Sequence, residues 1–207
     1  MSNMYIAIIN YNMGNIKSVE NAFKIIGAQV KVTSSPNIIR KAEAVVLPGV
    51  GAFQDAVKNL KQLRLYDSVI EATGSEKPFL GICIGLQVLF EYGKEGGKSD
   101  GLGIFKGSVE RIPPGVKIPH MGWNKIKIVK EKSLLFKNIK NGESFYFVHS
   151  YHVFCDDENL ISSLTEYGIN LVSSIEYKNI YGLQFHPEKS SISGLQILKN
   201  FASIAGI

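Results

Sequence analysis

Apolar runs and amphipathic stretches alternate along the first half of the chain. Continuous apolar runs at 5–9, 44–47 and 79–82 are typical of strands buried on both faces, and residues 29–33 alternate as a half-buried strand does. The run at 44–47 is expected to stop at Pro48-Gly49.

Three helices are predicted between and after these strands. Apolar residues from Val19 to Ile26 recur at helical spacing, and Gly27 follows as a stop signal. The other two predicted helices span residues 53–72 and 84–92. Strands separated by helices of this length predict βαβ units and a parallel sheet.

Beyond Tyr92 the pattern changes to strands with few helices. Residues 93–103 read as a glycine-rich polar loop, and a helix with Leu195, Leu198 and Phe201 on one face ends the chain. We therefore predict a single α/β domain over residues 1–207 with a β-rich second half. The strands predicted in that half cover residues 107–111, 125–129, 144–148, 160–165, 172–177 and 180–184.

The composition is that of a globular protein. The chain has 207 residues, of which 45% are hydrophobic and 20% are charged, so disorder, a collagen-like fibre and a disulfide-built miniprotein are excluded. No apolar run approaches the roughly 18 residues of a membrane span. Because the N-terminus also lacks the basic segment and cleavage site of an export signal, we expect a cytoplasmic protein with no membrane partner.

Charge and cysteine content narrow the possible partners. The net charge is +5, but the lysines are dispersed, which favours a solvated surface over a nucleic-acid site. The two cysteines, Cys83 and Cys155, form no CxxC or Cys/His cluster, so neither a metal site nor a cofactor is predicted. The sequence leaves a disulfide between them open, although a reducing compartment disfavours it.

Cys83 has the surroundings of a catalytic nucleophile. It lies in Gly81-Ile82-Cys83-Ile84-Gly85, between a predicted buried strand and a predicted helix. The sharp turn of such an elbow strains the nucleophile's backbone, the helix N-terminus favours a thiolate, and the Ile84 N–H can face an oxyanion. The alternative is a buried structural cysteine.

A base and a carboxylate follow the last predicted strand. His186 comes just after that strand, Pro187 ends it, and Glu188 is two residues beyond the histidine. A thiolate nucleophile needs a histidine for proton transfer, and the histidine needs a carboxylate that fixes its tautomer. The alternative, a surface histidine near an unrelated glutamate, does not explain the cysteine elbow.

A second glycine-rich turn follows the strand at 44–47. In Pro48-Gly49-Val50-Gly51 the glycines let backbone N–H groups face a ligand, and they leave the Gly49–Val50 peptide free to rotate. Because this loop and the cysteine elbow both follow strands, they are expected at the same edge of the sheet. The alternative is a simple connecting turn.

Together these motifs resemble those of the class I glutamine amidotransferases, and more narrowly those of the glutaminase subunit of imidazole glycerol phosphate synthase. The resemblance covers essentially the whole chain and implies a central, mostly parallel sheet flanked by helices, with an antiparallel, β-rich second half. The motifs that carry it are Pro48-Gly49-Val50-Gly51-Ala52-Phe53, Gly81-Ile82-Cys83-Ile84-Gly85-Leu86-Gln87, Lys117-Ile118-Pro119-His120-Met121-Gly122-Trp123-Asn124, Phe147-Val148-His149-Ser150-Tyr151 and Gln184-Phe185-His186-Pro187-Glu188-Lys189-Ser190.

The resemblance implies that Cys83, His186 and Glu188 hydrolyse the side-chain amide of L-glutamine through a glutamyl thioester. Val50 and Ile84 would supply the oxyanion donors. For Gln87 and Glu95 the alternatives are a polar residue on a helix and a solvated loop glutamate. The residues implied to hold the substrate are Gly49, Gly51, Gln87, Glu95, Ser150 and Tyr151.

The resemblance also implies a heterodimer with a (β/α)8-barrel cyclase, to which the ammonia passes. There it would give imidazole glycerol phosphate and an aminoimidazole carboxamide ribotide, in histidine biosynthesis. Trp123 is expected in an exposed loop, where tryptophan is a common interface anchor, and its alternative is a core position. The implied docking residues are Asn12, Asn15, Met121, Trp123 and Asn124.

The N-terminal loop departs from the family pattern, because Asn10 replaces an acidic residue and Asn12 replaces a glycine. Asparagine tolerates a left-handed backbone, so the turn is expected to survive. The change leaves other functions open: the same glutaminase feeding a different synthase, for example in surface-sugar biosynthesis, a free-standing γ-glutamyl cysteine hydrolase, or an inactive scaffold.

Overall fold

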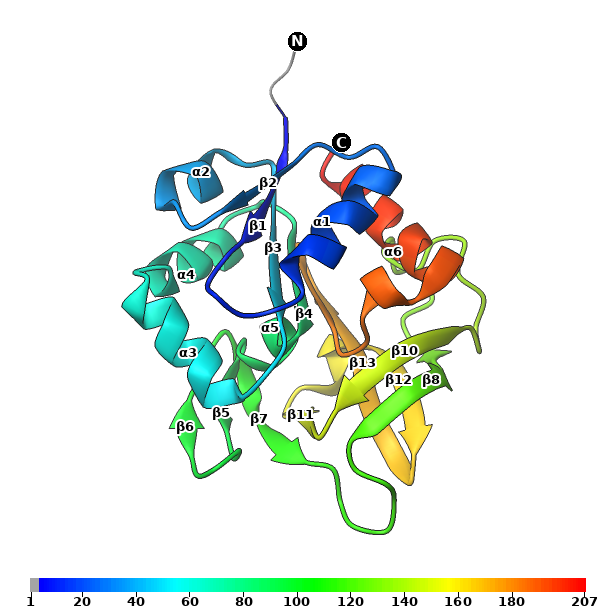
Figure 1. Cartoon of the computed structure of the whole chain (residues 1–207). Helices are drawn as coiled ribbons and strands as arrows, with labels where there is room; N and C mark the ends of the chain where they lie inside the picture. The colour runs from blue at the N-terminus through cyan, green and yellow to red at the C-terminus, as the bar shows by residue number, and fades with distance from the viewer. Residues whose placement is uncertain (1–3) are drawn as a thin grey trace.

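A computed structural model describes residues 4–207 and has one large mixed sheet at its centre (Figure 1). Within the described residues the sheet has eight strands in the order β2-β1-β3-β4-β14-β13-β12-β9. The first five are parallel, and the last three are antiparallel to their neighbours. In that order the strands are Val30–Thr33, Ile6–Ile9, Ala44–Gly49, Phe79–Cys83, Ile180–Leu183, Ile169–Tyr177, Ile161–Tyr167 and Lys127–Ile128.

Helices cover the parallel half of this sheet on both sides. α1 (Ile16–Ile25) packs beside α6 (Ser191–Ile204) on one side, with the rings of Phe23 and Phe201 6.4 Å apart. The other side carries α2 (Pro36–Lys41), α3 (Phe53–Gln62) and α4 (Tyr66–Gly74). The mostly parallel sheet flanked by helices is therefore confirmed.

The remaining strands form two smaller sheets, while β9, β12, β13 and β14 of the β-rich second half belong to the main sheet. One has the order β11 (Tyr151–Cys155), β7 (Phe105–Arg111), β5 (Phe90–Gly93) and β6 (Ser99–Asp100). The other is the antiparallel pair of β8 (His120–Lys125) and β10 (Ser144–His149). Two 3-10 turns complete the described elements, η1 at Glu158–Leu160 and η2 at Pro187–Lys189.

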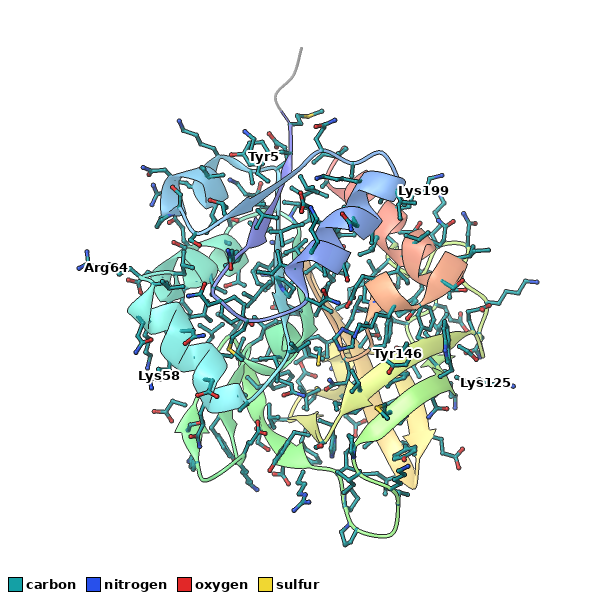
Figure 2. All side chains as sticks on the ribbon, in the orientation of Figure 1. Tyr5, Lys58, Arg64, Lys125, Tyr146 and Lys199 are labelled. Carbon is teal, nitrogen blue, oxygen red and sulfur yellow. The ribbon has the colours of Figure 1, made fainter. Side chains whose placement is uncertain are left out.

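Apolar side chains fill the layers between the sheets and the helices, and charged ones lie outside. The fully buried set includes Phe53, Phe79 and Phe185, whereas Lys58 and Arg64 are exposed and point away from the molecule (Figure 2). The dispersed positive charge therefore lies largely on the solvated surface. No helix within residues 4–207 has the length and apolar character that a membrane crossing requires.

The structure corrects the predicted helix at 84–92. α5 (Ile84–Gln87) is a single turn, and the chain then enters β5, whose residues pair with β6 and β7. The Leu89 carbonyl accepts hydrogen bonds from Ile104 and Phe105 rather than from a next helical turn. The structure of this segment is decided by its pairing with distant strands, and the local spacing of apolar residues carries no information about that pairing. For the same reason the predicted loop at 93–103 contains β6.

Other boundaries also differ from the sequence pattern. The predicted helix at 53–72 is two helices, α3 and α4, with Arg64 in a left-handed conformation (φ +57°) at the break. β3 runs through Pro48 to Gly49 because Pro48 still pairs with Ile82 of β4. The predicted strand at 125–129 is reduced to β9, and α2, β8 and β11 were not predicted. Trp123 lies in β8 rather than in a loop.

Candidate active site

The carboxyl ends of three neighbouring parallel strands meet at one edge of the main sheet. Gly49 at the end of β3 pairs with Cys83 at the end of β4, and Leu183 at the end of β14 pairs with Ile82. The glycine-rich turn, the cysteine elbow and the histidine segment therefore converge although they are far apart in the sequence. Open α/β sheets form their sites at this edge.

Cys83 occupies a strained backbone position between β4 and α5. Its φ is +54° and its ψ is −106°, a conformation that non-glycine residues adopt mainly where function requires it. A Cβ on Gly81 would come within 2.5 Å of the Gly85 carbonyl oxygen, and one on Gly85 would overlap the Leu47 carbonyl oxygen. Both glycines are therefore required by the tight packing of the elbow.

His186 and Glu188 are held together by a short rigid turn. The His186 Nδ1 and the Glu188 Oε1 are 2.8 Å apart, and both side chains are almost completely buried. Since the carboxylate only accepts, Nδ1 carries the proton and Nε2 is left for chemistry. The backbone N–H of His186 donates to the Tyr146 carbonyl of β10, and the Ser190 hydroxyl donates to the backbone carbonyl of His186.

The electrostatics favour a charged imidazole. Burial alone would lower the pKa of His186, but its neighbours Cys83 and Glu188 outweigh burial and raise that pKa to about 10. The buried Nε2 atom has no hydrogen-bond partner among residues 4–207. The arrangement therefore suits a charged imidazolium whose Nε2 proton is available for transfer.

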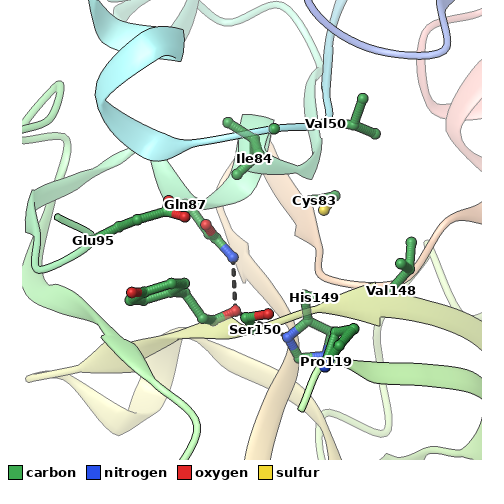
Figure 3. Close-up of a pocket in the computed structure, with 11 residues that line it drawn as sticks. Val50, Cys83, Ile84, Gln87, Glu95, Pro119, Val148, His149 and Ser150 are labelled. Atoms are coloured by element: carbon green, nitrogen blue, oxygen red, sulfur yellow. Dashed lines mark hydrogen bonds between the residues drawn. The ribbon is translucent and has the colours of Figure 1, made fainter.

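A cavity of about 250 Å³ opens beside Cys83 (Figure 3). Seven of the eight predicted substrate and oxyanion residues line it, and the eighth, Gly49, is buried behind the loop. The volume suits a small polar molecule such as an amino acid. The lining residues are Val50, Gly51, Cys83, Ile84, Gln87, Glu95, Pro119, Val148, His149, Ser150 and Tyr151.

Gln87 reaches the cavity wall from α5. Its Nε2 donates to the Tyr151 carbonyl at 2.9 Å and to the Gln184 Oε1 at 3.0 Å, which uses both of its hydrogens. Its Oε1 is buried and unpaired among the described residues, so it can accept a hydrogen bond from a ligand.

Glu95 reaches the same cavity from the loop after β5. Its Oε2 accepts the Phe53 N–H at the start of α3, at a distance of 2.8 Å. This contact fixes the carboxylate at the cavity wall, where it can face a positively charged group.

The predicted oxyanion loop packs tightly against the N-terminal loop. Val50 and Ile84 line the cavity on the side of Cys83, while Tyr11 lies behind Gly49 with a buried hydroxyl that has no partner among residues 4–207. Tyr11 was missed from the sequence because an apolar environment for its hydroxyl is a tertiary property. The assignment of Val50 and Ile84 as oxyanion donors stays a prediction.

The predicted docking residues divide into two groups. Met121 and Trp123 are 61% and 56% exposed, so these large apolar side chains are available to a partner. Asn12 and Asn15 are also exposed, and Asn12 has a φ of +62°. The left-handed turn is therefore retained, with the Asn10 side chain accepting the Asn12 N–H at 3.2 Å.

Asn124 differs from the other docking residues because its side chain is turned inward. Its Nδ2 donates to the Glu166 carbonyl and contacts the His120 Nε2 at 3.2 Å. The His120 Nδ1 lies 2.9 Å from the His149 Nε2, and the His149 Nδ1 lies 2.9 Å from the Tyr151 carbonyl. A polar chain, half-buried at Asn124 and buried at the two histidines, therefore runs from β8 to the cavity, and neither histidine was predicted to take part.

Metal ligands and a disulfide were the other sequence questions about this site. Within residues 4–207 no group of three or more His, Cys, Asp or Glu side chains is placed to hold a metal ion. Cys83 and Cys155 are both free thiols. Burial raises the pKa of Cys155 to about 12, so this second cysteine lacks the character of a nucleophile.

Comparisons with known proteins agree with this geometry. The family described as "Glutamine amidotransferase class-I" matches residues 7–205. The imidazole glycerol phosphate synthase subunit HisH of Moorella thermoacetica is 47% identical over 199 residues, covering 96% of this chain and 94% of the relative. The same subunit of Caldanaerobacter subterraneus subsp. tengcongensis is 49% identical, covering 96% and 98%.

Solved structures extend the likeness to more distant proteins. A glutamine amidotransferase superimposes with a TM-score of 0.74 and 17% identity, covering 97% of this chain and 99% of the other. PurLQS from Thermotoga maritima gives a TM-score of 0.74 and 16% identity, covering 97% and 98%. At such identities these structures share the fold alone.

Proposed function

Because this chain belongs to the class I glutamine amidotransferases and, within them, to the HisH subunits of imidazole glycerol phosphate synthase, we propose that Cys83, His186 and Glu188 hydrolyse glutamine to supply ammonia to a synthase partner. The observation that carries this proposal is that the cysteine elbow lines one cavity, while a buried His–Glu pair follows the neighbouring strand β14. The proposal treats residues 1–207 as one amidotransferase domain that acts in the cytoplasm.

The first step is attack on the substrate amide. The Cys83 thiolate forms a C–S bond with the side-chain carbonyl carbon of glutamine, and the π electrons move to the oxygen. The N–H groups of Val50 and Ile84 stabilise this oxyanion, a contribution of roughly 10²–10³ in rate for each donor. Ile84 is suited to this role because the first N–H groups of a helix have no partner within it.

The second step releases ammonia, and the third restores the enzyme. His186 transfers its Nε2 proton to the amide nitrogen as the C–N bond breaks, which leaves a glutamyl thioester. The neutral Nε2 then takes a proton from water, whose oxygen attacks the thioester and expels the Cys83 thiolate and glutamate. Throughout, Glu188 accepts the hydrogen bond that the His186 Nδ1–H donates, which orients the ring.

The cavity positions the amino-acid end of the substrate. The unpaired Oε1 of Gln87 and the fixed carboxylate of Glu95 are acceptors for an ammonium group, and the backbone at Ser150 and Tyr151 forms the facing wall. Gly51 also lines the cavity, and its φ of +112° is one that glycine adopts without strain.

The proposed partner is a (β/α)8-barrel cyclase, bound as a heterodimer. The relatives at 47% and 49% identity are named as subunits of imidazole glycerol phosphate synthase, and the exposed Met121 and Trp123 give a surface of the kind that anchors a partner. Ammonia delivered there would give imidazole glycerol phosphate and an aminoimidazole carboxamide ribotide.

The decisive experiment measures glutamine hydrolysis by this chain with and without the cyclase of its own organism and the acceptor nucleotide. We expect weak hydrolysis alone and strong hydrolysis in the ternary mixture, because the Gly49–Val50 peptide can rotate away from the oxyanion. Cys83→Ala should abolish hydrolysis but not synthesis from added ammonium, and Cys155→Ser is the matched control. Full activity without a partner would favour the free-standing hydrolase, and a cyclase that neither binds nor activates the chain would favour another synthase.

A further inference from the structure

Gln184 lies against the sulfur of the proposed nucleophile. Its Nε2 is 3.7 Å from the Cys83 Sγ, and the Gln184 side chain is fully buried. Its backbone is fixed in the sheet, since the Gln184 N–H donates to the Ser173 carbonyl of β13 at 2.9 Å. Burying a side-chain amide costs free energy unless its polar atoms have hydrogen-bond partners. The Gln184 amide is therefore held in one orientation by its neighbours.

The direction of the Gln184 amide follows from groups that only accept. The Tyr151 carbonyl cannot donate, so the side-chain atom of Gln87 that lies 2.9 Å from it is the NH₂ group. The same NH₂ group faces Gln184, which turns the Gln184 Oε1 toward Gln87 at 3.0 Å. The Gln184 NH₂ group is therefore the one that faces Cys83.

An N–H donor beside the Cys83 sulfur stabilises the charged form of that sulfur. A thiolate accepts hydrogen bonds far better than a neutral thiol does, so the donor stabilises the charged form. The proton on His186 Nε2 moves to the departing ammonia and is regained only when water is deprotonated, whereas the Gln184 N–H faces the sulfur in every step. It would then stabilise the Cys83 thiolate again when water expels it from the thioester.

We infer that Gln184 is a catalytic residue that donates a hydrogen bond to the Cys83 thiolate, and that Gln87 is the positioning residue that sets the direction of its amide. This inference rests on the proposed role of Cys83 as the nucleophile. It adds to the triad a hydrogen-bond donor from the residue directly after β14, on the same segment that carries His186.

The test follows the alkylation of Cys83 by iodoacetamide from pH 5 to 10 in the full chain, with the modified site located by mass spectrometry. Gln184→Met keeps the approximate shape and removes the donor. Gln184→Glu keeps the acceptor for Gln87 but places a carboxylate oxygen toward the sulfur. The control is Gln62→Met, an exposed position on α3.

We expect the alkylation midpoint to rise by about 1–2 pH units in Gln184→Met, since a hydrogen bond to a charged group is lost. The rise should be at least as large in Gln184→Glu, and absent in Gln62→Met. A midpoint that stays unchanged in a folded Gln184 variant, even if hydrolysis falls, would overturn the inference. Gln184→Glu, being isosteric, carries the test if Gln184→Met does not fold.

This readout separates the inference from the proposed function. Alkylation needs neither glutamine nor a partner, so a shifted midpoint in a chain that fails to hydrolyse glutamine within its complex would refute only the proposed function. Normal hydrolysis by the unaltered chain with no shift in either variant would refute only the role of Gln184.

Discussion

Gly49→Ala tests how closely the oxyanion loop is packed against the N-terminal loop. A Cβ at Gly49 would overlap the Tyr11 hydroxyl oxygen and approach the Ile84 Cβ to 2.9 Å, whereas ordinary contacts begin at 3.4 Å. The backbone of Gly49, unlike that of Gly51, is not left-handed, so the cost comes from packing alone. Overpacking in a buried site costs about 1–3 kcal/mol of unfolding free energy.

The Tyr11 hydroxyl provides a second perturbation at the same place. Tyr11→Phe removes the atom that the new methyl group meets first, and it also removes a buried hydroxyl without a partner among residues 4–207. An unpaired buried polar group costs about 1–3 kcal/mol, so Tyr11→Phe alone should leave stability unchanged or raise it. In the Tyr11→Phe background, Gly49→Ala should cost at least about 1 kcal/mol less, with the Ile84 contact as the remainder.

Urea unfolding followed by far-ultraviolet circular dichroism measures this cycle, with midpoints compared at constant slope. Gly74→Ala is the matched control, because no atom lies within 4 Å of its added Cβ and its backbone is not left-handed. Equal costs of Gly49→Ala in the two backgrounds would refute the packing argument. A Gly49→Ala cost as small as that of Gly74→Ala would refute it as well.

Three further predictions concern the triad, the histidine chain and the docking surface. In the active complex, His186→Ala should lower the turnover of glutamine by roughly 10²–10⁴-fold and Glu188→Gln by less, and a Glu188→Gln complex with unaltered turnover would reassign Glu188 to structure. Burial lowers the pKa of His149 to about 3 and that of His120 to about 4, so below pH 6.5 the unfolded chain binds more protons than the folded chain does. The urea midpoint should therefore fall as the pH drops from 6.5 to about 4, and it should fall less steeply in a His120→Asn/His149→Asn variant. Equal slopes in the two proteins would contradict this prediction. Trp123→Ala should weaken cyclase binding, measured by calorimetry, by about 2 kcal/mol or more without changing the fold, whereas Leu134→Ala, equally exposed elsewhere, should not.

The sequence determined the elements whose residues decide their own structure. The apolar runs of β1, β3 and β4 are strands because they are buried on both faces, and the spacing of Val19, Ala22 and Phe23 fixes the buried face of α1. The cysteine elbow and the His-Pro-Glu turn were also readable, because each is a local backbone geometry set by neighbouring glycine or proline residues.

Tertiary structure decided the segments whose partners are distant. The stretch from Ile84 to Gly93 has helical periodicity, yet it becomes one helical turn and a strand because β7 and β6 pair with it. The loop expected around Trp123 is a strand because β10 supplies its hydrogen bonds. Pairing energy of this kind depends on which segments meet, and that information is absent from a local window.

The same division holds within the site. The residue types of the triad could be named from the sequence, since their chemistry is a property of the side chains themselves. The direction of the Gln184 amide, the unpaired Tyr11 hydroxyl and the neutral His120–His149 pair could not, because each depends on acceptors and burial contributed by other strands. The sequence therefore specified which groups are candidates for the chemistry, and only the packing of β3, β4, β10 and β14 decided how each group is oriented.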